Sequence, residues 1–366
     1  MIGFTVSAND NAIKWLTVGQ EPNIEINGLA WIDENKGLYC RLPVREKKNI
    51  TDLAWLTSKC PSGARIRFKT DSTQLKLSIN HGMDDKSDVE LEAWFYKYVK
   101  DYMSPIAARG IDLYRGEPAN MSFYLTTLPT EVSKHYIHIF NIMNQSRQMR
   151  EFTLYLPIYA ELAELKIGID SGAVIQKPTE YKIKKPIVFY GTSITQGGYA
   201  SRGSNSFASI VGRRLNADIV NLGFAGSGCG EEIMAKLMTE IDASVYVVDS
   251  VANMSSQLMK ERYEKFITIL RQTKPNTPVI LMTRAKYTHE YRPDTIANYD
   301  DQHKPLFATY EKLKKQGDKN IHLFDVGAII KPGGDHPSVD GGHLSDTGFY
   351  IIADELTPFL KNILAL

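Results

Sequence analysis

The hydrophobic period of the chain changes near residue 180, and this change constrains the fold more than any other feature. From about Ile24 to Asp170, apolar and polar residues alternate, which places the apolar side chains on one face of a strand. Turn signals such as Pro61–Gly63 separate the runs. Many short strands at this spacing predict an antiparallel β-sandwich or jelly roll over residues 1–180. The alternating runs are Ala64–Thr70, Leu75–Ile79, Tyr136–Phe140, Phe152–Leu156 and Leu165–Ile169.

After residue 182 the apolar residues come in short continuous runs, which are typical of parallel strands buried on both faces. These runs are Ile187–Tyr190, Ile219–Leu222, Val245–Val248, Val279–Met282 and Ile321–Phe324. Helical patterns lie between them, at 207–215, 231–241, 257–272 and 305–315. A last helix is expected from about Ser345, kinked or shortened by Pro358. This alternation predicts a flavodoxin-like, doubly wound α/β domain over residues 184–366.

Composition and charge exclude several classes of function. The 366 residues carry 43 Lys and Arg against 42 Asp and Glu, so nothing draws the protein electrostatically to nucleic acid or an anionic membrane. No apolar run reaches the roughly 18 residues that span a bilayer. The three cysteines, Cys40, Cys60 and Cys229, are too few for a disulfide framework and form no zinc-type cluster. A Cys40–Cys60 bridge is left open.

The first strand-to-helix loop of the parallel sheet holds a candidate nucleophile. Functional groups gather beyond the carboxyl ends of parallel strands, and Gly191–Gly198 directly follows the run that ends at Tyr190. Ser193 in this loop suits a nucleophile beside backbone N–H donors. The plainer interpretation is a glycine-rich turn whose hydroxyl caps a helix. The loop is not a GxSxG elbow, because Thr195 replaces the second glycine, and no GK[ST] follows to make a phosphate loop.

Three further loops at the same edge carry groups that complete a hydrolase site. Gly226 allows a backbone N–H to approach an anion, and Asn253 can aim its side-chain amide at one. Asp340 and His343 lie three residues apart before the last helix, so the carboxylate can orient the imidazole as a base. Each signal alone is more typical of a turn or a cap. Their coincidence at one edge of the sheet favours a serine hydrolase.

These segments, in this order, resemble the sequence blocks of the SGNH (GDSL-type) hydrolases. The matching residues are Ser193 for block I, Gly226 for block II, Asn253 for block III, and Asp340 with His343 for the DxxH pair of block V. Residues 110–114, Gly-Ile-Asp-Leu-Tyr, match letter for letter the GxDLY motif of one SGNH subgroup, whose members carry an N-terminal β-domain. The resemblance therefore covers both halves of the chain.

The sequence departs from the family pattern at three places. Thr192 replaces the aspartate of the GDS triplet, and Val251–Met254 keeps only the asparagine of GxND. The aromatic-rich stretch Asp88–Met103, which fits either a helix or a long strand, is longer than the resemblance implies before GxDLY. We expect it to be an insertion that reshapes the mouth of the site.

The resemblance implies acyl transfer at a serine. His343 would take the proton of Ser193 as its Oγ attacks an ester carbonyl, while Asp340 orients and stabilises the imidazolium. The backbone N–H groups of Ser193 and Gly226, with the side chain of Asn253, would form the oxyanion hole. This chemistry needs no metal or organic cofactor.

The implied substrate is a small acyl ester. An SGNH core joined to a jelly-roll-like domain resembles carbohydrate esterases that remove acetyl groups from glycans, which is an analogy of fold. A lipase or thioesterase, an acyltransferase and a non-catalytic glycan-binding protein are the alternatives, and the presence of all five site residues argues against the last. Tyr114 of GxDLY and Arg284, after the fourth strand, are candidate substrate contacts, although packing or solvation explains either as well.

Two further features bear on substrate and location. Trp31, Trp55 and Trp94 could stack on sugar, although large aromatic residues in a β-domain are more often core. The N-terminus lacks the basic and apolar segments of a signal peptide. Because glycan esterases of this kind are often exported, the resemblance favours a mature periplasmic or extracellular protein, with the cytoplasm as the alternative. The oligomeric state does not follow from the sequence.

Overall fold

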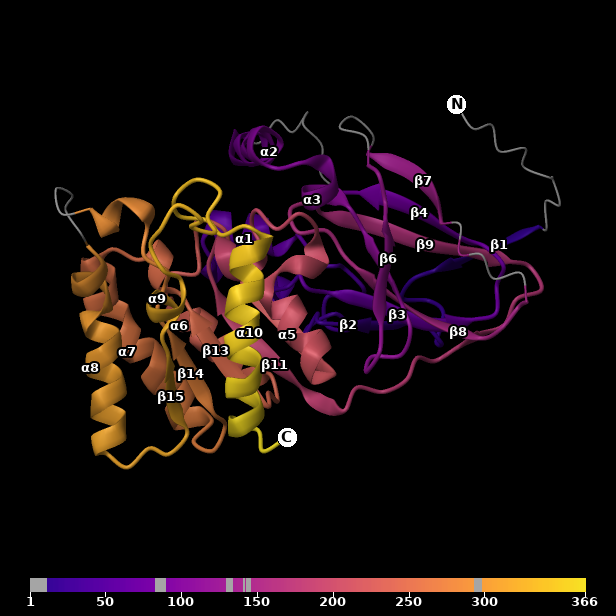
Figure 1. Cartoon of the computed structure of the whole chain (residues 1–366). Helices are drawn as coiled ribbons and strands as arrows, with labels where there is room; N and C mark the ends of the chain where they lie inside the picture. The colour runs from indigo at the N-terminus through magenta and orange to yellow at the C-terminus, as the bar shows by residue number, and fades with distance from the viewer. Residues whose placement is uncertain (1–11, 83–89, 130–133, 141, 143–145, 293–297) are drawn as a thin grey trace.

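The computed structural model describes residues 12–82, 90–129, 134–140, 142, 146–292 and 298–366. Figure 1 shows two parts that follow one another along the chain. The N-terminal half, coloured indigo to magenta, is built mainly of strands, and the C-terminal half, ending in orange and yellow, packs helices around a sheet. Residues 1–11, on which the expectation about export depends, lie outside the described residues.

Two antiparallel sheets form the N-terminal half. The first has the strand order β1-β9-β4-β7, and the second has the order β10-β3-β8-β5-β6 with β2 paired to β3. The strands are β1 (Ile13–Thr17), β2 (Glu25–Asn27), β3 (Arg65–Thr70), β4 (Leu75–His81), β5 (Asp112–Arg115), β6 (Ser122–Thr126), β7 (His135–Phe140), β8 (Arg150–Tyr155), β9 (Leu162–Asp170) and β10 (Ile175–Gln176). Side chains from both sheets, such as Leu77, Ile167 and Phe68, meet in one core. The predicted antiparallel sandwich is confirmed.

The polar face of β3 is buried, although the alternation predicts an exposed one. Arg65 and Arg67 are 2% and 1% exposed. Arg65 pairs with Asp218 of the C-terminal half and donates to the carbonyl of Ile219 at 3.3 Å. The Cζ of Arg67 lies 3.9 Å from the ring centroid of Tyr181. This face of the sandwich therefore meets the rest of the chain instead of solvent.

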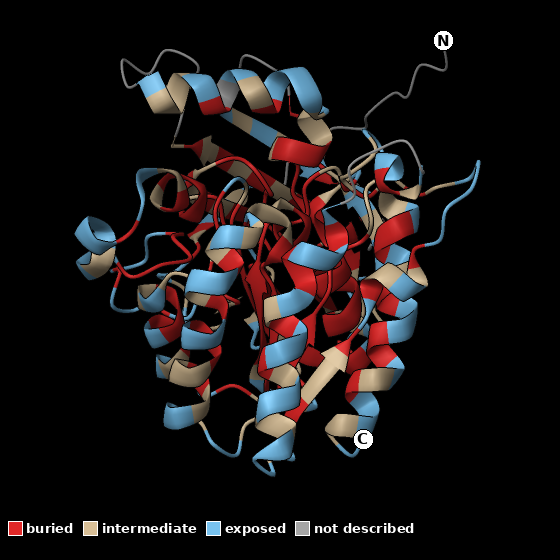
Figure 2. Ribbon diagram, turned by 90° about the vertical axis from the view of Figure 1, so that its left-hand side faces the viewer, coloured by how far each residue is buried: buried red, intermediate tan, exposed pale blue. Residues whose placement is uncertain are grey.

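The stretch that fits either a helix or a strand is a helix, α2 (Glu90–Tyr102). Its predicted first residues, 88 and 89, lie outside the described residues. Phe95 and Val99 of α2 are buried in a core shared with the C-terminal half. Figure 2 shows α2 lying across the top of the molecule with exposed positions facing outward. The other helices of this half are η1 (Val44–Asn49), α1 (Asp52–Ser58) and α3 (Pro105–Arg109).

A five-stranded parallel sheet forms the centre of the C-terminal half. Its strands are β11 (Ile183–Gly191), β12 (Ala217–Gly223), β13 (Val245–Asp249), β14 (Val279–Met282) and β15 (Ile321–Phe324). Their order, β12-β11-β13-β14-β15, is the flavodoxin-like order and confirms the predicted doubly wound domain. The order reverses at β11, so a ligand is expected beyond the carboxyl ends of β11, β12 and β13.

Helices cover both faces of this sheet (Figure 1). On one face pack α5 (Phe207–Leu215) and α10 (Asp346–Ile363), and on the other pack α6 (Glu232–Glu240), α7 (Ser256–Thr273) and α8 (Tyr299–Lys315). Two helices extend past a proline further than the sequence predicts, and Pro358 does not shorten α10. Helix α8 begins at Tyr299, before Pro305, and α10 runs past Pro358 to Ile363. Burial of the apolar face of each helix outweighs the one backbone hydrogen bond that its proline removes.

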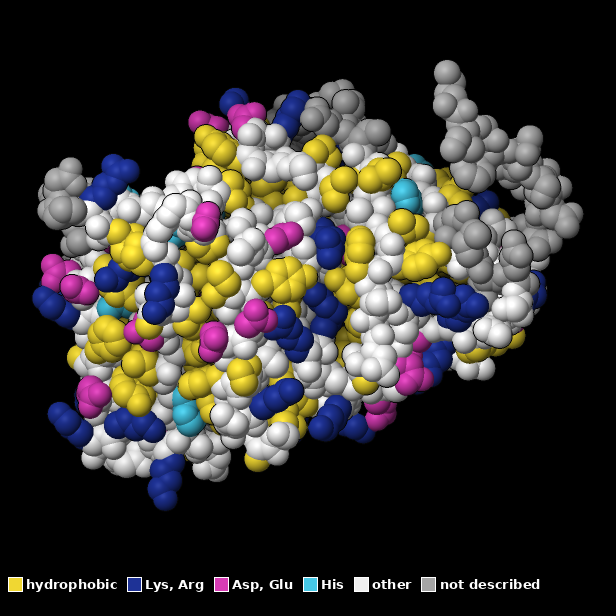
Figure 3. All heavy atoms as spheres, viewed as in Figure 1, with side chains coloured by type: hydrophobic (Ala, Val, Ile, Leu, Met, Phe, Trp, Pro, Cys, Tyr) yellow, Lys and Arg dark blue, Asp and Glu magenta, His cyan; other side chains and the backbone are white. Residues whose placement is uncertain are grey.

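The structure shows whether Cys40 and Cys60 are bonded, whether any described helix could span a membrane, and how charge is distributed on one face. None of the described helices is long and apolar enough to cross a membrane. Cys40 and Cys60 are both free, buried thiols, so they form no bridge. On the face shown in Figure 3, basic and acidic side chains are interspersed.

Candidate active site

Ser193 opens a short helix, α4 (Ser193–Gln196), directly after β11. Thr192 caps this helix, because its Oγ1 accepts a hydrogen bond from the Ile194 N–H at 3.3 Å. The threonine that replaces the GDS aspartate thus still supplies a cap. Gly191 must lack a side chain, since a Cβ there would lie 2.2 Å from Thr195 Oγ1 and 2.3 Å from the Asp249 carbonyl oxygen. This close packing holds Ser193 at the end of β11.

Ser193 lies within hydrogen-bond distance of His343. Ser193 Oγ and His343 Nε2 are 3.0 Å apart, and His343 Nδ1 and Asp340 Oδ2 are 2.7 Å apart. The other carboxylate oxygen of Asp340 accepts from the backbone N–H groups of Gly342 at 3.0 Å and His343 at 2.7 Å. The three side chains have the arrangement of a nucleophile, a base and an orienting acid.

The environment of the pair keeps Asp340 ionised. Partial burial acts to raise the pKa of Asp340, but the hydrogen bonds from the His343 ring and from the N–H groups of His343 and Gly342 hold that pKa below its ordinary value. The ring of Tyr199 covers His343 with a centroid distance of 4.6 Å. Tyr199 has a φ of +68°, which is unusual for a residue with a side chain. Sequence reasoning missed Tyr199, although it directly follows the two glycines of the nucleophile loop.

Gly226 and Asn253 lie on neighbouring turns. The hydrogen bond from the Ser227 N–H to the Phe224 carbonyl, at 3.0 Å, closes a turn in which Gly226 takes a φ of +65°. That position favours glycine. Asn253 ends η3 (Val251–Asn253), and its Nδ2 donates to the carbonyl oxygens of Phe224 at 3.4 Å and Ser227. The Asn253 amide therefore contacts the turn that carries Gly226.

Buried polar side chains join this turn to the nucleophile loop. Gln196 Oε1 accepts from the Ala225 N–H at 2.9 Å. Asn221 donates from Nδ2 to the Thr195 carbonyl at 2.7 Å. The loops after β11 and β12 are thus held in fixed relation to one another.

Arg41, 1% exposed, reaches the same turn from the N-terminal half. Its guanidinium donates to the carbonyl oxygens of Thr57 at 2.7 Å, Cys60 at 2.6 Å, Asn221 at 3.1 Å and Gly223. Burial lowers the pKa of Arg41 to about 10, which leaves it charged at neutral pH. The N-terminal half therefore supplies a cation that supports the backbone leading to Gly226.

A hollow of about 330 Å³ opens beside the serine and the histidine. It is lined by Ser193, Ile194, Ala252, Asn253, Tyr287, Thr288, His289, Asp340, Gly341, Gly342 and His343. The structure thus brings four of the five predicted site residues to one hollow, with Gly226 on the turn that Asn253 contacts. The sequence predicts that the loop after β14, residues 284–292, lines the pocket, and Tyr287, Thr288 and His289 of this loop form one wall of it.

Arg284 lies behind that wall instead of in the pocket. It is 2% exposed, and its guanidinium makes two hydrogen bonds to the Glu290 carboxylate at 2.7 and 2.6 Å. Glu290 in turn accepts from the Tyr287 N–H at 2.8 Å. The expectation of a direct substrate contact at Arg284 is corrected: this residue holds η4 (Thr288–Tyr291), the turn that forms the pocket wall.

Tyr114 lies in the interface between the two halves and not at the pocket. It is 4% exposed, and its hydroxyl donates to Ser204 Oγ at 3.2 Å. Asp112 of the same GxDLY motif accepts from the Ser204 N–H at 2.8 Å. The expected substrate contact at Tyr114 is therefore corrected to a packing role. The motif binds η2 (Gly203–Asn205) of the C-terminal half.

The same loop continues to the segment that carries His343. Asn205 Nδ2 donates to Asp346 Oδ2 at 2.8 Å, and the Ser201 N–H donates to Asp346 Oδ1 at 2.8 Å. Asp346 is the first residue of α10, just after the loop of His343. A continuous set of hydrogen bonds thus runs from GxDLY to the loop of the candidate base.

The tryptophans divide into core and surface. Trp31 is buried and donates from Nε1 to Glu240 at 2.9 Å, and Trp55 packs against the core of the C-terminal half. Trp94 on α2 is 52% exposed. Of the three, only Trp94 therefore presents a large free surface.

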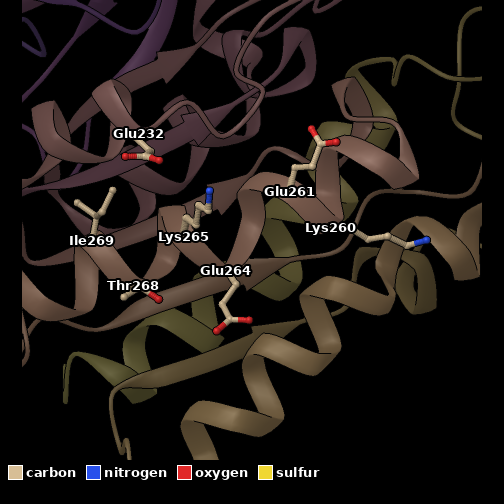
Figure 4. Close-up of a pocket in the computed structure, with 7 residues that line it drawn as sticks. All are labelled: Glu232, Lys260, Glu261, Glu264, Lys265, Thr268 and Ile269. Carbon is tan, nitrogen blue, oxygen red and sulfur yellow. The ribbon is translucent and has the colours of Figure 1, made fainter.

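A second hollow, of about 490 Å³, lies on the outer side of α6 and α7 (Figure 4). It is lined by Glu232, Lys260, Glu261, Glu264, Lys265, Thr268 and Ile269, nearly all from α7. None of the predicted site residues lines it. Among the described residues, no group of three or more His, Cys, Asp or Glu side chains could hold a metal ion.

Asp249 is a buried carboxyl beneath the nucleophile loop. Its Oδ2 accepts from Thr195 Oγ1 at 2.7 Å. Burial raises the pKa of Asp249 to about 7, and the Thr195 hydrogen bond opposes this only in part. Because the folded-state pKa lies above the ordinary value, the protonated carboxyl stabilises the fold. That stabilisation is complete below the ordinary pKa of 3.8 and declines as the pH rises from there, until it is lost above about 7.

Asp249→Asn keeps the hydrogen-bond acceptor and removes the charge. We expect Asp249→Asn to be more stable than wild type at pH 5 and at pH 8, with the larger difference, about 1–3 kcal/mol, at pH 8, because the wild-type carboxyl loses its stabilising effect progressively between about pH 4 and pH 7. Urea unfolding at the two pH values measures the difference. Exposed Asp33→Asn serves as the control and should shift little at either pH. A variant less stable than wild type at pH 8 would contradict the assignment.

The fold is an antiparallel sandwich followed by a parallel sheet of flavodoxin-like order. A Ser, an Asn and an Asp/His pair lie at the strand ends of that sheet. This is the architecture of the two-part SGNH-type hydrolases. The family model of the GDSL-like lipases and acylhydrolases matches residues 184–361. The model of GxDLY, the N-terminus of SGNH-hydrolase-type esterases, matches residues 13–175. The chain belongs to this family, and the resemblance seen in its motifs is confirmed.

Solved structures of similar fold include esterases and a transferase. A putative GDSL-like lipase from Bacteroides ovatus is 25% identical, with a TM-score of 0.83 over 97% of this chain and 98% of that one. A salicylyl-acyltransferase from a tetracycline biosynthetic pathway is 18% identical, with a TM-score of 0.73 over 96% and 97%. A family two carbohydrate esterase from Clostridium thermocellum, in complex with cellohexaose, is 13% identical, with a TM-score of 0.61 over 83% and 93%. No curated protein matches the sequence.

Proposed function

We propose that this protein is a serine esterase that releases short acyl groups, above all acetyl, from a carbohydrate through an acyl-enzyme on Ser193. The observation that carries the proposal is the 3.0 Å contact between Ser193 Oγ and His343 Nε2 at the carboxyl end of β11. Family membership supports ester hydrolysis. The carbohydrate esterase of similar fold supports a glycan as an analogy of fold. An acylated glycan as substrate also favours a periplasmic or extracellular location.

The proposed reaction is two successive acyl transfers. Ser193 Oγ attacks the ester carbonyl carbon while His343 Nε2 takes the hydroxyl proton, and the ionised Asp340 stabilises the imidazolium. The tetrahedral intermediate collapses, the bond from the carbonyl carbon to the sugar oxygen breaks, and the imidazolium protonates the leaving alkoxide. Water then attacks the acyl-serine, with His343 again as the base. Release of the carboxylic acid restores Ser193.

The lining of the pocket favours a short acyl group over a fatty one. Its volume is about 330 Å³, and Ile194 and Ala252 are the only aliphatic side chains among the residues that line it. A long acyl chain needs a more apolar wall. A lipase or thioesterase is therefore the weaker alternative.

Solvent access favours hydrolysis over transfer to an acceptor alcohol. The side chains of Asp340 and His343 are 41% and 28% exposed, so water can reach the base. An acyltransferase would gain from excluding water, because water competes with the acceptor for the acyl-enzyme.

A series of p-nitrophenyl esters from acetate to octanoate tests the acyl preference. We expect kcat/KM to fall at least about tenfold from acetate to octanoate, since the pocket offers little apolar surface to the longer chain. A preference for octanoate would instead indicate a lipase or thioesterase. If no ester is turned over in a Ser193-dependent way, the proposed esterase is wrong, and transfer to a specific partner becomes the better explanation.

Asn253→Ala tests the oxyanion hole. We expect kcat on p-nitrophenyl acetate to fall about 10²- to 10³-fold, because one donor to the developing oxyanion is removed. Asn362→Ala, at an exposed position of α10, is the matched control and should have the wild-type kcat. A wild-type kcat in Asn253→Ala would remove this residue from the oxyanion hole.

A further inference from the structure

Helix α2 is fixed against the catalytic half and presents a row of aromatic rings beside the site. Phe95 and Val99 bury one face of the helix in the shared core. Trp94, Tyr98 and Tyr102 are spaced by four residues, so they follow one another along a single flank of the helix. We call these three side chains the α2 aromatic row.

The rings of the α2 aromatic row pack against one another and remain accessible. The centroids of Trp94 and Tyr98 are 5.7 Å apart with an interplanar angle of 21°, and those of Tyr98 and Tyr102 are 4.8 Å apart at 37°. Trp94 is 52% exposed and Tyr102 is 58% exposed. In Figure 3, hydrophobic side chains reach the surface where Figure 1 places α2. Exposed large aromatic residues in a contiguous row are typical of a binding surface.

The row is continuous with the candidate base. The hydroxyl of Tyr98 lies 3.4 Å from that of Tyr199, and the Tyr199 ring covers His343 with a centroid distance of 4.6 Å. A ligand that extends from an ester bound at Ser193 past Tyr199 would therefore meet Tyr98 and its neighbours on α2. Tyr199 thus links the row to the candidate base.

Charge and length indicate the chemistry of the ligand. Three charged side chains of α2 are already paired, Lys97 with Asp101 at 2.7 Å and Glu92 with Lys59 at 3.1 Å, which favours a neutral ligand. Tyr102 comes eight positions after Trp94 in the helix, a rise of about 12 Å, which is longer than one sugar ring. The apolar C–H faces of pyranose rings suit stacking on aromatic rings, and tyrosine hydroxyls can bond the sugar hydroxyls.

We propose that the α2 aromatic row is a subsite for the neutral oligosaccharide whose acyl ester is cleaved at Ser193. This inference rests on the proposed esterase function and names the alcohol part of its substrate. The row binds sugar rings on the leaving-group side, while the pocket beside Tyr287 receives the acyl group. The aromatic stretch before GxDLY thus forms part of the site.

Paired kinetics and binding test the subsite. The kinetic quantity is the ratio of kcat/KM on acetylated cellohexaose to kcat/KM on vinyl acetate, whose leaving group is too small to reach α2. We expect Trp94→Ala and Tyr102→Ala each to lower this ratio about tenfold, as the loss of an exposed stacking anchor does. Phe307→Ala, which removes an exposed aromatic residue from α8, should leave the ratio unchanged. Calorimetry with acetylated cellohexaose in the Ser193→Ala background should show about tenfold weaker binding for the same two variants.

The outcomes separate this inference from the proposed function. If the wild type turns over no ester in a Ser193-dependent way, the esterase function fails, whereas the calorimetric result still reports on the row. If vinyl acetate is hydrolysed but the ratio and the oligosaccharide affinity are the same in Trp94→Ala and wild type, the subsite is wrong. If Trp94→Ala and Tyr102→Ala lower the turnover of phenyl acetate but not that of acetylated cellohexaose, the row binds an aromatic ligand. That result would also overturn the proposal. Circular dichroism spectra confirm that each variant is folded.

Discussion

Replacing Ser193 by alanine is expected to lower kcat on acetyl esters by about 10⁴- to 10⁶-fold. The serine hydroxyl lies 3.0 Å from His343 Nε2, and the variant leaves no oxygen there to attack the carbonyl. The side chain of Ser193 is partly exposed, so its removal should hardly change the fold. Turnover of p-nitrophenyl acetate at saturating concentration measures the loss.

The triad interpretation also predicts that losses at its members do not add. If His343 acts through Ser193, the double variant Ser193→Ala/His343→Ala should be no slower than Ser193→Ala alone. Ser171→Ala, at an exposed turn of the N-terminal half, is the control and should keep the wild-type kcat. Additive losses, or substantial turnover in Ser193→Ala, would show that another group is the nucleophile.

Arg41→Met is expected to lower the free energy of unfolding by about 3–5 kcal/mol. Methionine fills much of the volume but leaves without a donor the carbonyl oxygens that Arg41 bonds, including those of Asn221 and Gly223. Because these carbonyls lie on the strand that leads to Gly226, kcat should fall as well in the protein that remains folded. Urea unfolding and turnover of p-nitrophenyl acetate at low temperature measure the two effects.

Arg45→Met supplies the matched control for Arg41. Arg45 pairs with Glu34 and Glu240, but its side chain is 39% exposed, so its loss should cost less than about 1 kcal/mol. Equal losses of stability in the two variants would contradict the structural role of Arg41. A folded Arg41→Met protein with wild-type kcat would contradict its support of the Gly226 turn.

The parallel strands could be predicted closely from the sequence because burial on both faces leaves a continuous apolar run. The predicted runs Val279–Met282 and Ile321–Phe324 coincide with β14 and β15. The site followed from the same logic, since Ser193, Asn253 and His343 stand where strands and loops of such a sheet deliver functional groups to one edge. These predictions succeed because they depend only on residues that are close together in the sequence.

The parts that could not be predicted depend on contacts between residues far apart in the chain. Arg41 lies 180 residues before Asn221, the residue whose carbonyl it bonds, and nothing near Arg41 distinguishes it from a surface arginine. Arg65 occupies an alternating position that usually faces water. The sequence predicts that the loop after β14 lines the pocket, but no pattern within it distinguishes Tyr287, which lines the pocket, from Arg284, which is buried behind it.

The shared core has a consequence for how such a protein can evolve. Apolar residues of the first half, among them Leu56, Phe95 and Ile158, are buried in the same cluster as Ile187 and Phe349 of the second half. A gene fragment that encodes the second half alone would yield a chain with an uncovered apolar flank. The N-terminal half is therefore not an exchangeable module that recombination could swap for an unrelated domain. The two halves should be inherited together and should melt in a single cooperative transition.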